Sequence, residues 1–447
     1  MNSPDEPRRS PGSPPWQRDL FHILVGSACG LMIGLAFYRL APRGGGDAAE
    51  RYTRVQAYVE EAYVREVDDE QLADEALRGM LASLDPYSRY YTRTELAAME
   101  RETSGRYRGI GVVFARPTQE GRVLFAMPDS PAARAGIDVG DRFLEVDGVE
   151  VAGLEVGGLH ALLAEQGEGP LRLRVVSRAG LERELELVRA ELVDPTVRHV
   201  DLLDPERGLG YLAIQSFSLE TPAEFDAAVS ELRQRGMTGL VVDVRGNLGG
   251  VLRSAVTLAN RFVREGLIVS QEGRGDPVLY KASASEAWYV DLPLVVLIDG
   301  LSASASEVFA AALQEHRAAV VVGSPSYGKG VVQEVRRLED QGAVKLTTAY
   351  YYTPAHRNLE RTVEDAWDAG LHPDLQVELN ELEAQRLHQQ LATYSPPPGS
   401  LDRIRAWEAE ERRELLPPYA RDAQLSAALE LLRGERPGAY ATGTEQP

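Results

Sequence analysis

From residue 211 onward, short runs of uninterrupted apolar residues alternate with segments of helical spacing, and this alternation is the strongest constraint on the fold. Three such runs lie at residues 239–244 (apolar apart from Asp243), 294–298 and 318–322. A strand that is apolar on both faces must be covered on both faces, which is typical of a parallel sheet between helices. The sequence therefore predicts an α/β core over residues 194–379.

Composition excludes several classes of protein. The length of 447 residues allows roughly two or three domains. A net charge of −20 argues against nucleic acid as a partner. Cys29 is the single cysteine, so no internal disulfide can form, and the seven histidines are scattered. We therefore predict neither a metal site nor a cofactor.

The N-terminus predicts a membrane anchor. Residues 1–20 are typical of a disordered tail, and the run at 21–38 carries no charge. That run is long enough for a marginal membrane span, which we place at residues 21–40. Arginines on both sides give a weak bias toward a cytoplasmic N-terminus, and no cleavage site follows cleanly. We expect a single-pass anchor in the inner (cell) membrane, with the rest of the chain periplasmic or otherwise extracytoplasmic.

Three further regions surround or interrupt the α/β pattern. Residues 50–104 have helical periodicity, and residues 105–193 form short strands with two helices, which predicts a small β-rich domain. Residues 380–447 are predicted to be a helical region and tail, broken by proline clusters. Within the core, the sequence from Thr221 to Glu224 predicts a capping box at the start of a helix.

Residues suited to hydrolysis follow each of the three apolar runs. Gly249 and Gly250 follow the first run, Ser304 follows the second, and Lys329 follows the third. In an open α/β sheet, ligands bind outside the carboxyl ends of the strands. If the three strands are neighbours, these residues meet at one edge of the sheet.

A serine and a lysine can act together without a histidine. Only three of the 48 basic residues are lysines. An arginine stays protonated in a protein, whereas a desolvated lysine can lose its proton and activate a hydroxyl group. A helix beginning near Ala305 would direct free N–H groups at a developing oxyanion. Taken singly, each feature also fits a plainer role: a loop lysine, an ordinary glycine turn, or serines that cap and pack a helix.

The serine motif occurs a second time in the sequence, and we call this second occurrence the decoy copy because we expect it to have no catalytic role. Residues 282–286 repeat the five letters of residues 303–307. No buried apolar run of the parallel type leads into the copy, so we predict that residues 282–286 form a loop.

Five motifs together resemble the C-terminal processing peptidases, the tail-specific serine proteases. The motifs are Leu84-Asp85-Pro86-Tyr87-Ser88, Tyr107-Arg108-Gly109-Ile110-Gly111, Asp243-Val244-Arg245-Gly246-Asn247-Leu248-Gly249-Gly250, Ser302-Ala303-Ser304-Ala305-Ser306-Glu307 and Gly328-Lys329-Gly330-Val331-Val332-Gln333. The resemblance covers roughly residues 50–375 and the segment near 422–432. Leu248 stands where the family usually has proline, and residues 380–420 hold more charge and proline than the family pattern.

The resemblance implies roles for individual residues. Ser304 would be the nucleophile, Lys329 the general base, and Gln333 the side chain that positions the lysine. The oxyanion hole would be formed by the Ala305 N–H group and the glycine pair, Gly249 and Gly250. The protease core would be crotonase-like.

The resemblance also makes the inserted region 105–193 a PDZ-like domain. Its carboxylate-binding loop would include Gly109, Ile110, Gly111 and Val112. The implied function is a serine endopeptidase that binds protein or peptide substrates by their C-terminal tails. A homo-oligomer is compatible with this function. Two other functions stay open: a non-catalytic PDZ adaptor on a protease-like fold, and a crotonase-type acyl-CoA enzyme.

Overall fold

The computed structural model describes residues 46–115, 120–154, 158–159, 162–163, 169–339, 342–361, 369–391, 396, 401–411 and 422–435. The chain divides into two compact units, residues 1–80 and 81–447. The first unit contains helix α2 (Gly46–Ala62) and most of α3 (Asp69–Ala82). Over the described residues, no helix is both long and apolar enough to cross a bilayer. The anchor predicted at residues 21–40 lies outside these residues.

A six-stranded sheet forms the centre of the second unit. Its order is β10 (Val197–Asp204), β11 (Leu209–Ile214), β12 (Gly239–Asp243), β15 (Leu294–Ile298), β16 (Val320–Gly323) and β19 (Leu375–Gln376). From β11 to β19 all neighbours are parallel, which confirms the predicted parallel sheet. Strand β10 pairs with β11 in the antiparallel direction, a pairing that the apolar runs did not predict.

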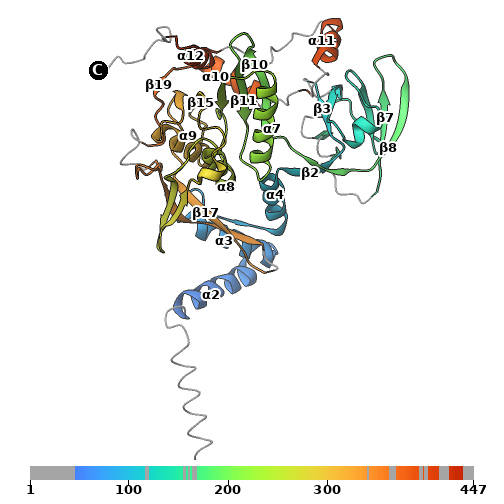
Figure 1. Cartoon of the computed structure of the whole chain (residues 1–447). Helices are drawn as coiled ribbons and strands as arrows, with labels where there is room; N and C mark the ends of the chain where they lie inside the picture. The colour runs from blue at the N-terminus through green and yellow to red at the C-terminus, as the bar shows by residue number, and fades with distance from the viewer. Residues whose placement is uncertain are drawn as a thin grey trace, which may run out of the picture. The chain divides into compact units, whose positions relative to one another are not determined.

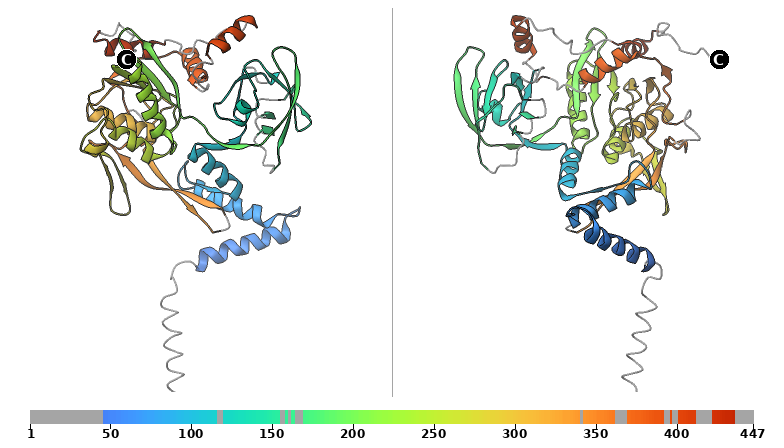
Figure 2. Two further views of the ribbon diagram at one scale, coloured as in Figure 1. Left: turned by 45° about the vertical axis from the view of Figure 1, so that its right-hand side comes forward. Right: turned by 180° about the vertical axis from the view of Figure 1, so that it is seen from behind.

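Helices cover both faces of this sheet, as the apolar strands require. One face packs on α7 (Thr221–Gln234), α8 (Leu252–Asn260) and α9 (Ala305–Glu315). The other face packs on α10 (Glu381–Leu391) and α12 (Ala423–Leu432). Successive residues of β12 alternate between them, since Leu240 and Val242 join the first cluster and Val241 joins the second. Figure 1 shows α7 alongside β10 and β11, and Figure 2 shows the C-terminal helices beside the same sheet.

A second sheet carries residues that line the candidate site. It consists of β1 (Arg89–Tyr91), β13 (Leu267–Gly273), β14 (Val278–Lys281), β17 (Val331–Arg337) and β18 (Ala343–Tyr352). Its order is β1-β18-β13-β14, and β17 also pairs with β18. The decoy segment 282–286 is a loop, as predicted, with one 3₁₀ turn at Ala284–Glu286.

The inserted domain has its own core. Strands β2 (Arg106–Gly109) and β9 (Ala190–Val193) pair at its two ends. Between them lie β3 (Val112–Phe114), β4 (Val123–Ala126), α5 (Pro131–Arg134), β5 (Arg142–Val146), β6 (Val149–Glu150), β7 (Leu171–Val176) and β8 (Glu182–Leu187). Phe143, Leu171 and Val175 are buried in a cluster separate from the sheet core. These strands and their separate cluster make the described part of this region β-rich, with a core of its own.

The predicted capping box at Thr221 is wrong. The N-cap of α7 is Glu220, whose side chain makes no capping hydrogen bond. Glu224 instead accepts hydrogen bonds from the backbone N–H groups of Thr196 and Val197, at 2.8 and 2.9 Å. This carboxylate satisfies backbone donors at the start of β10, a tertiary role that local sequence cannot reveal.

Helix α11 (Leu401–Glu410) packs on the outer face of the inserted domain. Ile404 and Trp407, both buried, belong to a cluster that includes Phe125 and Val139. Three ion pairs surround this contact: Arg403 with Asp138, Arg178 with Glu410, and Arg122 with Glu411. Residues from the C-terminal region thus complete a surface of a domain encoded far upstream.

Replacing Trp407 with alanine is expected to release α11. A buried tryptophan contributes about 3–5 kcal/mol relative to alanine, which is more than a short helix retains without its packing face. Limited proteolysis would then cut within Leu401–Glu410 faster than in the unmodified protein. Trp288→Ala is the control because Trp288 is 50% exposed. Equal cleavage of the two variants would contradict the packing role.

Candidate active site

The three candidate segments lie at one edge of the central sheet because their strands are neighbours, which the sequence had left open. Strands β12, β15 and β16 are consecutive and parallel, and Gly249, Ser304 and Lys329 lie beyond their respective carboxyl ends. A Cβ atom on Gly249 would lie 2.9 Å from the Ser304 Cβ and 3.1 Å from the Ala305 N. The φ angle of Gly249 is +104°, a value that side chains disfavour. The glycine loop therefore requires glycine where it touches the serine segment.

The surroundings of the three serines separate their roles. Ser302 and Ser306 are fully buried, and their hydroxyls donate to the carbonyls of Val244 and Asn247, each at 2.9 Å. Ser304 is partly exposed. Its φ and ψ angles are 57° and −114°, a strained backbone for a residue other than glycine. Of the three serines, Ser304 is thus the one that is neither buried nor held by a hydroxyl hydrogen bond to a loop carbonyl.

One backbone N–H group in the glycine segment and one in the serine segment lack a hydrogen-bond acceptor among the described residues. Gly249 donates its N–H to the Asn247 Oδ1 at 2.8 Å. The N–H groups of Gly250 and Ala305 have no hydrogen-bond acceptor among the described residues. Ala305 is the first residue of α9, where free N–H groups and the helix dipole favour negative charge. Of the three predicted donors, Gly249 already has a partner.

Glu307 connects the serine segment to the lysine loop, a role that sequence reasoning missed. Its carboxylate accepts hydrogen bonds from the Ser304 N at 2.7 Å, the Gly328 N at 2.7 Å and the Lys329 N at 2.9 Å. The Ser326 hydroxyl also donates to it. Burial raises the pKa of Glu307, and these hydrogen bonds act in the opposite direction. The available signal was the spacing of Ser304 and Glu307, which is that of a capping box.

Lys329 lies in a partly desolvated position. Burial lowers the pKa of its ammonium group below the ordinary 10.5, while the carboxylates of Glu360 and Glu307 act in the opposite direction. Its Nζ lies 4.8 Å from the centre of the Tyr87 ring. Glu360 accepts a hydrogen bond from the Gly330 N at 2.7 Å. Removing the proton from this lysine is therefore easier than from a lysine in water.

The Tyr87 ring is fixed by the turn that contains it. The Asp85 Oδ1 accepts from the Tyr87 N at 2.8 Å and from the Ser88 N at 2.7 Å. The Ser88 hydroxyl in turn accepts from the Thr347 N of β18 at 3.1 Å. The motif at residues 84–88 was part of the resemblance, but its contact with Lys329 emerges only from the fold.

The structure places Gln333 on a strand of the second sheet and the predicted PDZ residues at the start of the inserted domain. Gln333 is on β17, and its Nε2 is buried without a hydrogen-bond partner among the described residues. No hydrogen bond joins it to Lys329 within that part of the chain. Gly109 ends β2 and Val112 begins β3. Between them, the carbonyls of Ile110 and Gly111 accept hydrogen bonds from within the inserted domain.

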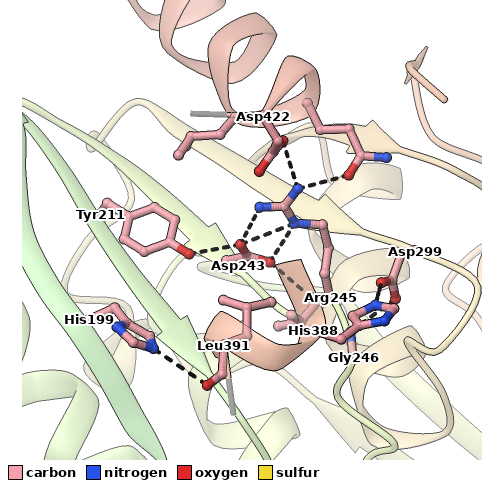
Figure 3. Close-up of polar contacts among 12 residues, drawn as sticks. His199, Tyr211, Asp243, Arg245, Gly246, Asp299, His388, Leu391 and Asp422 are labelled. Atoms are coloured by element: carbon pink, nitrogen blue, oxygen red, sulfur yellow. Dashed lines mark hydrogen bonds and ion pairs between the residues drawn. The ribbon is translucent and has the colours of Figure 1, made fainter. Parts of the chain in front are cut away.

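A buried arginine joins the glycine loop to the C-terminal region. Arg245 is 1% exposed and pairs with Asp243 at 2.7 Å and with Asp422, the N-cap of α12, at 2.9 Å (Figure 3). Gln424 accepts a further hydrogen bond from it, and Tyr211 donates to Asp243. Because an unpaired buried charge is strongly destabilising, this network fixes α12 against the start of the loop.

Known proteins match the chain over most of its length. Residues 208–377 match peptidase family S41, residues 123–177 match a PDZ domain, and residues 44–94 match the N-terminal domain of the activating protease CtpB. The carboxy-terminal-processing protease of Bartonella bacilliformis is 32% identical over 400 residues, 86% of this chain and 88% of that protein. The carboxy-terminal processing protease CtpB of Bacillus subtilis is 31% identical, over 79% of this chain and 77% of that protein.

Solved structures of related proteins also match the chain, and one of them is similar to it in sequence as well. A photosystem II D1 C-terminal processing protease is 28% identical, with 79% of this chain and 99% of that chain covered and a TM-score of 0.43. The matched family regions include the segments that carry Ser304 and Lys329. The chain belongs to peptidase family S41 and is a serine-type, PDZ-containing protease of the carboxy-terminal processing group.

Proposed function

We propose that the protein cleaves peptide bonds with Ser304 as the nucleophile and Lys329 as its general base. The observation that supports this proposal is that both residues follow neighbouring strands, β15 and β16, and that Glu307 accepts hydrogen bonds from the backbone N–H groups of both. Ser304 is the partly exposed serine of its motif, and burial lowers the pKa of Lys329. The sheet and its helices fit the crotonase-like core that the sequence predicted.

In the first half of the reaction, the Ser304 Oγ attacks the carbonyl carbon of the scissile bond and its proton passes to the Lys329 Nζ. The N–H groups of Gly250 and Ala305 stabilise the resulting oxyanion, with Gly249 allowing the close approach. When the C–N bond breaks, Lys329 returns the proton to the leaving amine. Gln333 orients the lysine once substrate has bound.

The acyl group on Ser304 is then released by water. Lys329, neutral again, takes a proton from the water as it attacks the ester carbonyl, and the serine recovers its proton as the acid leaves. Each half of the reaction therefore uses the same base twice. No step requires a group beyond the side chains and backbone already described.

We propose that the PDZ-like domain selects substrates by their C-terminal carboxylate. The loop from Gly109 to Val112 would supply backbone N–H groups for the carboxylate, a known mode of peptide capture. The proposed anchor at residues 21–40 would keep the enzyme at the cell membrane, outside the cytoplasm, and a homo-oligomer would fit this arrangement. Fractionating cells that produce the full chain, with and without residues 1–45, tests the anchor.

A serine-reactive fluorophosphonate is expected to label Ser304 and to stop cleavage of an unstructured protein substrate. Ser283 occupies the equivalent place in the decoy copy, is exposed, and is expected to stay unlabelled. The labelling rate should rise with pH through the pKa of Lys329, below 10.5, because only the neutral amine accepts the proton. Peptide mapping by mass spectrometry measures both sites. Equal labelling of Ser283 and Ser304 would overturn the assignment.

A further inference from the structure

Helix α10 reaches the candidate active site through one side chain. The His388 Nε2 lies 2.6 Å from the Asp299 Oδ2 (Figure 3). Leu387 and Leu391 of the same helix are buried against the central sheet. The packing of these leucines fixes helix α10, and the fixed helix holds His388 beside Asp299.

The other oxygen of Asp299 holds the two loops that form the site. Its Oδ1 accepts hydrogen bonds from the Gly246 N at 2.9 Å, the Leu301 N at 3.0 Å and the Ser302 N at 3.1 Å. Asp299 follows β15 directly and is 8% exposed. One carboxylate thus connects the start of the glycine loop to the turn that precedes Ser304.

Asn247, the next residue of the glycine loop, connects Gly246 to two further backbone groups of the site. The Asn247 carbonyl accepts a hydrogen bond from the Ala303 N at 3.0 Å. The Asn247 Oδ1 accepts from the Gly249 N at 2.8 Å. A shift of Gly246 would therefore move Ala303, which precedes Ser304, and Gly249, which lies against the Ser304 segment.

We propose that His388 is a positioning residue of the protease. By holding the Asp299 carboxylate, it sets the glycine loop against the segment that carries Ser304. This inference rests on the proposed function, since it assigns His388 to the Ser304 site. It also gives the C-terminal region, beyond the family core match at residues 208–377, a part in catalysis.

The charges around His388 make the contact dependent on pH. Asp299 faces it from the end of β15, and Arg245 and Asp243 face it from the end of β12. The hydrogen bond to Asp299 raises the pKa of His388, which Arg245 partly opposes. Although burial acts the other way, the bond from His388 lowers the pKa of Asp299.

These directions define a pH window. The ion pair is complete below the ordinary pKa of His388, 6.5, and is lost as the pH rises through the raised value. On the acid side it is lost as the pH falls through the lowered pKa of Asp299. A neutral His388 can still donate a hydrogen bond, so the effect on catalysis is graded.

The test compares His388→Gln and His388→Ala with the unmodified full chain, using an unstructured peptide substrate. Glutamine keeps an N–H donor but cannot become charged, whereas alanine removes the contact. We expect His388→Ala to lower kcat by about 10–100-fold with little change in KM, as for other residues that orient a catalytic group. His388→Gln should restore most of this loss.

The pH profile separates positioning from a purely structural role. The titration of Lys329 affects both enzymes, so it cancels in the ratio of wild-type kcat to His388→Gln kcat. We expect this ratio to fall toward one as the pH rises through the pKa of His388. A control variant, His372→Gln, removes an exposed histidine and should leave kcat unchanged at every pH.

Asp299→Asn completes a double-mutant cycle. If His388 acts through Asp299, the loss from His388→Gln disappears when Asp299 is already asparagine. A ratio that does not vary with pH, or a His388→Ala enzyme with wild-type kcat, would overturn the inference. Cleavage that persists in Ser304→Ala would instead overturn the proposed function, so the two failures are distinguishable. Thermal unfolding of His388→Gln verifies that its fold is intact.

Discussion

Replacing Ser304 with alanine is expected to reduce kcat for peptide hydrolysis by at least about 10⁴-fold, because Ser304 is the proposed nucleophile and its loss leaves only binding and oxyanion stabilisation. Lys329→Arg should cause a comparable loss. Arginine has a similar reach and the same charge, but it does not lose its proton in a protein. Initial rates with an unstructured substrate measure both effects.

The decoy copy of the motif gives a matched control for this prediction. Ser283→Ala makes the same chemical change within the same five letters, in an exposed loop. It should cleave at the wild-type rate. A Ser304→Ala enzyme that retains more than about 1% of wild-type kcat would place the nucleophile elsewhere.

Glu307→Ala is the second change with a large expected effect. It leaves the donors of Ser304, Ser326, Gly328 and Lys329 without their acceptor. Each buried donor that loses its partner costs about 1–3 kcal/mol. The nucleophile and the base would then no longer share a fixed support. We expect kcat to fall by about 100-fold, which is the loss that a misplacement of about 1 Å can cause, together with a lower melting temperature.

A second substitution separates the effect of the side-chain volume of Glu307 from the effect of its charge. Glu307→Gln keeps the volume and one acceptor oxygen, but its amide group faces donors. We expect it to lose less stability than Glu307→Ala while still losing most of its activity. Glu286→Ala, the same position in the decoy copy, is the control because that side chain is 50% exposed. Wild-type kcat in both Glu307 variants would exclude the supporting role.

The position of the site loops after buried parallel strands could be predicted because it depends on local patterns, whereas the adjacency of those strands was left open. The runs before Gly249, Ser304 and Lys329 are apolar on both faces, and such strands lie side by side in a parallel sheet. The capping spacing of Ser304 and Glu307 is also visible in the sequence, but the role of Glu307 was not predicted from it. The roles of Gly249, Gly250, Ala305 and Gln333 stay predictions.

The parts that the sequence did not reveal depend on long-range partners. Tyr87 meets Lys329 only because the turn at Asp85 docks on β18. Glu224 does not form the predicted capping box because its carboxylate accepts hydrogen bonds from backbone N–H groups at the start of β10. His388 looks like an ordinary helix residue until the fold places Asp299 beside it. None of these pairings has a spacing that a single sequence can disclose.

The packing of α11 on the inserted domain has a consequence for how the chain is made. Phe125 and Val139 are synthesised long before Trp407, which covers them in the finished protein. Until that helix emerges, the nascent domain presents an apolar face to its surroundings. A chain that stops before Leu401 would carry this face permanently. Synthesis through helix α11 is thus required to cover this apolar face of the PDZ-like domain. A prematurely terminated chain would expose the face, and exposed apolar surface is what chaperones bind.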